Sequence, residues 1–149
     1  MKRSEALVSL SREHHHALYL AKVISDQAGE GDSAQRFNDF WNREGADHFR
    51  IEEEVLLPGS GLSGPDGDPE VARMLADHLQ LRRAAKKISS GEATPEELVE
   101  AAGLLKAHVR FEERELFPRI EAGLSEEENR QLADEIEAAE RNLKPDPDQ

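Results

Sequence analysis

A pattern of eleven residues occurs twice in this chain, and it limits the possible folds more than any other feature. The two copies, His48–Pro58 and His108–Pro118, lie 60 positions apart. Each copy places His four residues before Glu, continues with a second Glu and apolar residues, and ends in Pro. Residues four apart share a face of an α-helix, so each copy would present an imidazole beside a carboxylate. Two such helices facing each other would enclose nitrogen and oxygen ligands, as in bundles that hold a metal pair.

The composition limits both the partners and the ligands of the chain. Its 149 residues suffice for a domain with its own core, and we expect a single domain over residues 1–149. The formal net charge of −13 disfavours nucleic acids and anionic membranes as partners. Because the sequence contains no cysteine, disulfides, iron–sulfur clusters and thiolate metal sites are excluded.

The polarity of the chain favours a cytoplasmic location. The chain becomes polar too soon, within residues Met1–Glu5, for a signal peptide. No apolar run approaches the roughly 20 residues of a transmembrane helix. We therefore expect a cytoplasmic protein without membrane association.

Apolar residues recur at helical spacing along nearly the whole sequence, and strand patterns are weak. We predict an all-α fold, an up-down antiparallel four-helix bundle over about residues 4–121. A short C-terminal helix over about 125–143 and a frayed tail at 144–149 would follow. The predicted bundle helices run from Ser4 or Ser9 to Ala28, from Ser33 to a loop that begins at Pro58, from Pro69 to Ser89, and from Thr94 to Pro118 or Glu121.

The repeat extends beyond the eleven-residue pattern to whole helical hairpins. His14 and His78 occupy matching places in the apolar stripes of the first and third helices, 64 positions apart. An acid precedes each of them, Glu13 or Asp77. The bundle would therefore bring four His and two Glu to its interior. Burying these groups without a cation would cost several kcal/mol, so the pattern predicts a metal site.

The predicted metal ligands are the histidines and glutamates that the two hairpins repeat. Helix register favours His14 over His15, but His15 remains an alternative or an additional imidazole ligand. Glu53 and Glu113 are rotated by about 100° from the preceding Glu, so we expect them to support ligands from outside or to be exposed, with metal binding by either as the minor alternative. The candidate ligands are His14, His48, Glu52, His78, His108 and Glu112, with His15 as the less certain one.

This ligand set indicates which metals fit. Imidazole and carboxylate without sulfur suit iron, manganese or zinc. Two carboxylates on facing helices can bridge two ions that lie about 3.5–4 Å apart. Four His and two Glu are few ligands for two six-coordinate ions, so positions remain for water, a bridging oxygen or a diatomic molecule.

These residues resemble the hemerythrin-like (HHE cation-binding) family, over about Leu7–Pro118. The resemblance implies a four-helix bundle with a non-haem di-iron centre, terminal His ligands, and Glu52 and Glu112 as bridges. Members of the family bind O2 reversibly, sense oxygen or iron, or handle NO and peroxide. Hemerythrin proper has a further His four residues before the third-helix ligand, whereas Met74 stands there in this chain.

Three functions are compatible with the pattern. The first is a protein with two iron ions that binds O2 or a related small molecule, for storage, delivery or sensing of oxygen or iron. The second is a di-iron redox enzyme acting on peroxide, NO or ferrous iron. The third is an interaction bundle that holds zinc or no metal. A sensor would need a separate signalling partner, and assembly into a homo-oligomer is open.

Overall fold

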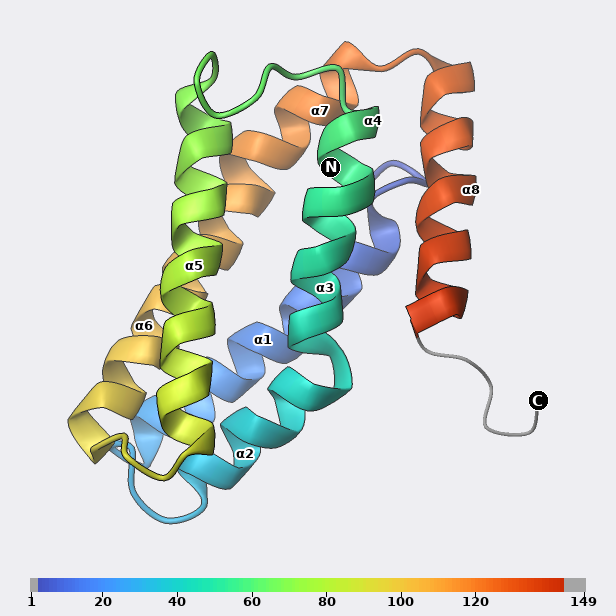
Figure 1. The fold of residues 1–149 in the computed structure, drawn as a ribbon. Helices are drawn as coiled ribbons and strands as arrows, with labels where there is room; N and C mark the ends of the chain where they lie inside the picture. Colours follow the sequence, from blue (N-terminus) through green and yellow to red (C-terminus); the bar gives the residue numbers. More distant parts are fainter. Residues whose placement is uncertain (1–2, 144–149) are drawn as a thin grey trace.

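The computed structural model describes residues 3–143, which form a bundle of helices with no strand among them (Figure 1). The elements in chain order, with η for a π-helical turn, are α1 Val8–Asp26, α2 Ser33–Phe40, η1 Trp41–Gly45, α3 Ala46–Ile51, η2 Glu52–Leu56, α4 Leu57–Gly59, α5 Pro69–Ser89, α6 Pro95–Phe111, η3 Glu112–Leu116, α7 Phe117–Gly123 and α8 Glu126–Leu143. The predicted tail at 144–149 lies outside the described residues.

Two helical hairpins make up the bundle. In the first, α1 is followed by a long helix that runs without a break from Ser33 to Gly59. In the second, α5 is followed by a long helix from Pro95 to Gly123. α1 packs along α6, and α5 contacts both α6 and α2, so the two hairpins face each other. The predicted all-α helical bundle is therefore confirmed.

The starts of α5 and α6 follow the capping signals in the sequence. The Asp68 side chain accepts hydrogen bonds from the amides of Glu70 and Val71. Thr94 and Glu97 form a reciprocal capping box at the start of α6. Both arrangements satisfy amides that have no partner within the first turn of a helix. α5 and α6 consequently begin at the prolines where the sequence places them.

Two prolines lie inside helices, which corrects the prediction of a loop from Pro58 onward. The helix continues past Pro58 to Gly59, and its counterpart continues past Pro118 to Gly123. Each proline is the second residue of the α segment that follows a π turn. A missing N–H costs little there, as in the first turn of a helix. The first helix is also shorter than predicted, since α1 ends at Asp26.

The buried apolar residues form two clusters that follow each other along the bundle. On α1, Leu10 belongs to one cluster and Ala17 to the other, and the buried His14 lies between them. On α5, Met74 and Leu81 enclose the buried His78 in the same way. The predicted histidines are thus held in the middle of the bundle, with apolar packing on either side.

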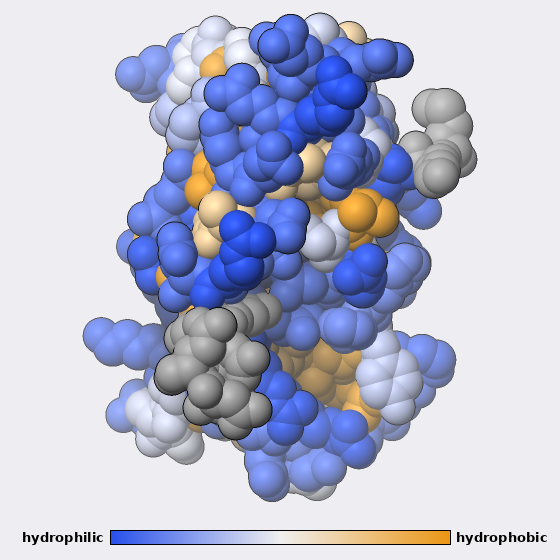
Figure 2. All heavy atoms as spheres, turned by 90° about the vertical axis from the view of Figure 1, so that its right-hand side faces the viewer, coloured by the Kyte–Doolittle hydropathy of each residue, from blue (hydrophilic) through white to orange (hydrophobic). Residues whose placement is uncertain are grey.

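The C-terminal helix α8 packs on the outside of the bundle, beside α3 and η2 (Figure 1). Its buried contacts come from Leu132 and Ile136. The face of the molecule that includes α8 is mostly hydrophilic, with apolar side chains visible in a few hollows (Figure 2). Within residues 3–143, no helix is long and apolar enough to cross a membrane.

Candidate metal centre

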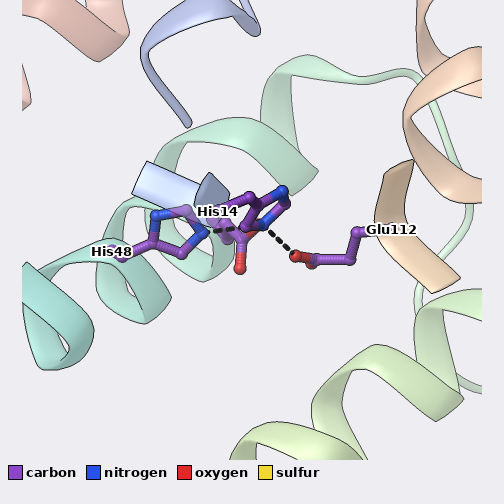
Figure 3. A group of neighbouring side chains, drawn as sticks. His14, His48 and Glu112 are labelled. Atoms are coloured by element: carbon purple, nitrogen blue, oxygen red, sulfur yellow. Dashed lines mark hydrogen bonds and ion pairs between the residues drawn. The ribbon is translucent and has the colours of Figure 1, made fainter. Parts of the chain in front are cut away.

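Six side chains from the four bundle helices converge between the two apolar clusters. They are His14 of α1, His48 of α3, Glu52 of η2, His78 of α5, His108 of α6 and Glu112 of η3. Their exposed fractions lie between 0 and 5%, so solvent is largely excluded. Figure 3 shows His14, His48 and Glu112 pointing toward one another. The structure brings together all six residues that the sequence marks as first-choice ligands.

The six residues form two overlapping groups, each able to surround one cation. One group contains the pair His14 and His48, and the other contains the pair His78 and His108. Glu52 and Glu112 belong to both groups. In each group, the candidate ligand atoms lie within 4.8 Å of one another. Two cation positions that share two carboxylates follow from this arrangement.

Each shared carboxylate lies between two imidazoles, one from each histidine pair. Glu52 Oε2 is 3.2 Å from His48 Nε2, and Glu52 Oε1 is 3.0 Å from His78 Nε2. Glu112 Oε1 is 2.9 Å from His14 Nε2 and 3.3 Å from His108 Nε2. All four imidazoles therefore direct Nε2 to the centre, the nitrogen through which His commonly binds a metal.

The other ring nitrogen of each histidine is held by a carboxylate from outside the centre. In the first pair, His14 Nδ1 donates to Glu113 Oε2 at 2.7 Å, and His48 Nδ1 donates to Glu13 Oε1 at 3.0 Å.

In the second pair, His78 Nδ1 donates to Glu53 Oε2 at 2.6 Å, and His108 Nδ1 donates to Asp77 Oδ2 at 3.0 Å. Such hydrogen bonds fix the tautomer and the orientation of metal-binding histidines. The sequence predicts Glu53 and Glu113 as supporting or exposed acids, and the structure places both in the supporting position.

A π turn begins at each of the two shared glutamates. The carbonyl of Glu52 accepts the amide of Leu57, five residues on, and the carbonyl of Glu112 accepts the amide of Phe117. A π turn holds one residue more than an α turn and is frequent at functional sites. Both turns begin at a shared carboxylate, and the sequence pattern gives no signal for them.

Several buried polar atoms of the centre have no well-directed hydrogen bond within the described part of the chain. These atoms are His48 Nε2, both carboxylate oxygens of Glu52, and Glu112 Oε2. An unpaired buried polar atom costs about 1–3 kcal/mol, and a buried charge costs more. Cations among these atoms would remove the cost, so the donor set fits a pair of metal ions.

The pKa values of the four histidines also indicate that the centre attracts positive charge. Burial is the largest single influence on the pKa of His48 and lowers it, but the charge of Glu52, the hydrogen bonds with Glu13 and Glu52 and the charge of Glu112 together hold that pKa well above its usual value. Burial likewise lowers the pKa of His108, but Glu112 and Asp77 raise it to about 10. Burial also lowers the pKa values of His14 and His78, but hydrogen bonds and charges of nearby carboxylates raise them above their usual value. Protons collect here when no metal is bound, and a metal must displace them.

His15 does not join the centre, which corrects its place as an alternative or additional ligand. It is exposed, because successive side chains on a helix point about 100° apart. His16 is exposed as well and bonds Glu44 through Nδ1 at 2.8 Å. The register of α1 therefore selects His14 from the run of three histidines.

Three further residues contact Glu53 or Glu113, and sequence reasoning did not find them. Ser11 Oγ donates to Glu113 Oε2 at 2.7 Å. Arg82 donates to Glu53 through both terminal nitrogens, at 2.8 and 3.0 Å. Arg3 Nη2 donates to the backbone carbonyl of Glu113 at 2.9 Å. None of these three residues lies at positions that repeat, so the hairpin pattern gives no sign of them.

A small cavity adjoins the centre beside His14 and His48. It offers about 10 Å³ to the centre of a water-sized sphere, close to the room that one water molecule needs. Ala17, Phe40 and Val109 supply apolar walls. The cavity therefore has room for about one water-sized molecule next to the first histidine pair.

Gly45 borders this cavity and leaves room for two neighbouring aromatic rings, of which Phe40 also lines the cavity. A Cβ at Gly45 would lie 3.0 Å from Phe40 Cε1 and 3.0 Å from Trp41 Cε3. Trp41 also stands edge-on to Phe49, with ring centroids 5.3 Å apart. Gly45 is thus the position at which a side chain would disturb the cavity wall.

Comparison with known proteins agrees with this geometry. The family model described as the hemerythrin HHE cation binding domain matches residues 6–120. The matched segment contains the first hairpin, the second hairpin up to Ile120, and all six residues of the centre. No curated protein and no solved structure matches the chain. Because the match covers most of the sequence, the chain belongs to the hemerythrin HHE cation-binding domain family.

Proposed function

We propose that this protein binds two iron ions and uses them to bind O2 or a related small molecule. The observation that carries the proposal is the position of Glu52 and Glu112 between the two histidine pairs. The oxygens of Glu52 face different pairs, since Oε2 is nearer His48 and Oε1 is nearer His78. A carboxylate placed in this way can give one oxygen to each of two ions, about 3.5–4 Å apart.

The donor set supports iron more than zinc. Each position is offered two imidazoles and the shared carboxylates, with no sulfur. Imidazole and carboxylate with open positions are typical of non-haem iron. Four protein donors would complete a tetrahedral zinc site, whereas six-coordinate iron would keep positions free. An interaction bundle with zinc or no metal is the alternative that metal analysis would detect, and manganese would fit the same donors.

The cavity supports a small neutral molecule as the ligand. Its apolar walls disfavour charged groups, and the carboxylates of Glu13 and Glu44 also border it, which disfavours anions. His14 and His48 would hold one ion at the edge of this cavity. Two ferrous ions, when bound, supply electrons to a diatomic ligand such as O2. Storage, delivery and sensing of oxygen or iron all use such binding.

A redox enzyme acting on peroxide, NO or ferrous iron is the second candidate. The observation in its favour is the small number of imidazoles at each position. The residue four before His78 is the buried Met74, and its counterpart on α1 is the buried Leu10. Each position therefore has two imidazoles, and both ions would keep free coordination positions for a reacting molecule.

An optical spectrum tests the proposal and separates the two candidates. The iron-loaded protein is reduced without oxygen, exposed to air, and then freed of oxygen again. We expect charge-transfer bands that appear in air and fade when oxygen is removed. Bands that persist, together with turnover of peroxide or NO, would support the enzyme. A protein that takes up no iron would contradict both.

A further inference from the structure

The supporting carboxylates of the two hairpins are themselves held in different ways. Glu53, which orients His78, receives two hydrogen bonds from Arg82, one on each carboxylate oxygen. Glu113, which orients His14, receives one bond from Ser11 on its carboxylate. Arg3 Nε stays 3.6 Å from the other Glu113 oxygen. Glu53 and Glu113 occupy matching places in the repeat, but they therefore differ in the residues that hydrogen-bond them.

A bond to both oxygens restrains a carboxylate more than a bond to one. The planar guanidinium of an arginine matches a carboxylate at two points, so it fixes direction as well as distance. Glu53 can turn little while Arg82 is in place, and its bond to His78 Nδ1 keeps one geometry. Glu113 is held by a single hydroxyl and by a more distant cation, which restrain it less.

The charge around the centre also requires cations beyond two divalent metals. Six carboxylates lie within the centre or bond its histidines directly, and two divalent ions would supply only four positive charges. The six are Glu13, Glu52, Glu53, Asp77, Glu112 and Glu113. Arg82 and Arg3 bring positive charge to the excess carboxylates from outside. Because both arginines pair with supporting acids, they relieve carboxylate repulsion without occupying a ligand position.

Stacking adds a second restraint on the His78 ring. Phe49 lies parallel to His78, with ring centroids 3.8 Å apart and an interplanar angle of 6°. The guanidinium carbon of Arg82 lies 5.8 Å from the Phe49 centroid, within the range of cation–π attraction. Arg82 thus borders both groups that fix His78, the carboxylate at Nδ1 and the ring on its face.

From these contacts, and on the basis of the metal pair proposed above, we propose that Arg82 is a positioning residue for the metal centre. By fixing Glu53 and through it His78, Arg82 strengthens cation binding at the position shared by His78 and His108. Glu113, which occupies the matching place behind His14, has no such two-point contact among the described residues. In the 64-residue register of the hairpins, Leu18 corresponds to Arg82. The two positions therefore bind metal with different affinity.

Cobalt titration of the full-length chain, stripped of metal with a chelator, tests this inference. The visible bands of Co2+ report its coordination, so each ion that binds is followed separately. We expect wild-type protein to bind two Co2+ in two steps. R82Q should bind one of them about tenfold more weakly, in the range found when a partner behind a metal-binding His is lost. The bands of the tighter-binding ion should remain as in wild type.

Two matched variants separate positioning from general damage. R83Q removes the exposed neighbouring arginine and should leave both steps unchanged. R82K keeps the charge but loses the two-point contact, so it should also weaken one step, by less than R82Q. Circular dichroism of the metal-free variants checks that each remains folded.

The outcomes distinguish this inference from the proposed function. Wild-type protein that binds two Co2+, with R82Q binding both as tightly or more tightly, would overturn the role of Arg82 alone. Equal weakening of both steps in R82Q would also overturn it, because the effect would then not be confined to one position. Wild-type protein that binds no Co2+ would overturn the metal pair itself.

Discussion

The Nε2 atoms of His78 and His108 lie 3.2 Å apart, although the two residues come from different helices. Glu53 and Asp77 accept hydrogen bonds from the Nδ1 atoms of these rings. A neutral imidazole that donates from Nδ1 carries its lone pair on Nε2. Two lone pairs at this distance repel each other unless a proton or a metal ion lies between them. This relationship is the simplest physical reason to expect a cation at the centre.

Replacing a shared carboxylate should remove metal from both positions. Loss of a residue that hydrogen-bonds a metal ligand from outside lowers metal affinity roughly 10- to 100-fold. We expect E52A or E112A, which lose a ligand itself, to lower the affinity by more than this. The metal-loaded protein should also be less stable, because metal binding contributes to folding. Elemental analysis and thermal unfolding provide the measurements.

Two neighbouring acids serve as controls for this loss. Glu54 is exposed and pairs only with Arg50 on the surface, among the contacts that the structure describes, so E54A should retain wild-type metal content. E53A should give an intermediate loss, since Glu53 holds His78. Equal metal content in E52A, E112A and E54A would exclude the shared carboxylates as ligands.

The run of three histidines on α1 offers a second test with internal controls. His14 is buried against Glu112, whereas His15 and His16 are exposed. We expect H14A to lose at least one metal ion per chain and H15A and H16A to lose none. Metal content of the three purified variants decides the matter. A loss in H15A equal to that in H14A would mean that the register of α1 is wrong.

A methyl group at Gly45 should affect the small ligand more than the metal. G45A would place Cβ 3.0 Å from ring atoms of Phe40 and Trp41 and press on the cavity wall. We expect weaker NO binding to the ferrous protein with unchanged metal content. At Gly103, where a Cβ would meet no atom within 4 Å, G103A should instead stabilise the helix by about 0.5–1 kcal/mol. Unchanged NO affinity in G45A would exclude the cavity as the ligand site.

The link between Asp68 and Arg119 predicts how stability depends on acid. Arg119 Nη2 lies 2.7 Å from Asp68 Oδ2, and this contact with the amides at the start of α5 lowers the pKa of Asp68 to about 2. Its ordinary pKa is about 3.9. A carboxyl group whose pKa is lower in the folded than in the unfolded protein stabilises the native state when the pH is above its unfolded-state pKa. This stabilisation is lost as the pH falls through the folded-state pKa.

The difference in unfolding free energy between wild type and D68A should therefore be full above about pH 4 and shrink toward about pH 2. At neutral pH we expect D68A to be less stable by about 1 kcal/mol, the usual contribution of a helix cap. Urea unfolding at several pH values measures both quantities. A difference that is constant from pH 7 to 2 would contradict the contribution of the Asp68 charge.

Much of the centre follows from short-range patterns in the sequence. His48 and Glu52 are one turn apart on one helix, so helix geometry alone places them side by side. The apolar stripe of α1 selects His14 because it is the histidine in register with Leu10 and Ala17, which are both buried. These inferences need only the period of a helix, and the hydrogen-bonded caps at α5 and α6 follow from similarly local signals.

The remaining features depend on contacts between helices, which local spacing does not determine. The π turns after Glu52 and Glu112 have no sequence signature and arise where helices pack around the centre. The two bonds from Arg82 to Glu53 join α5 to η2, and they depend on how the two hairpins pack against each other. Pro58 indicates a helix end when taken alone, and only the preceding π turn explains why the helix continues.

The metal content of the protein, purified from iron-supplied cells without added metal, tests the central claim most directly. Elemental analysis should find two iron ions per chain, because Glu52 and Glu112 are shared by two histidine pairs. The same protein carrying both E52A and E112A should hold little or none. A single ion per wild-type chain, zinc in place of iron, or a folded protein without metal would contradict a di-iron centre.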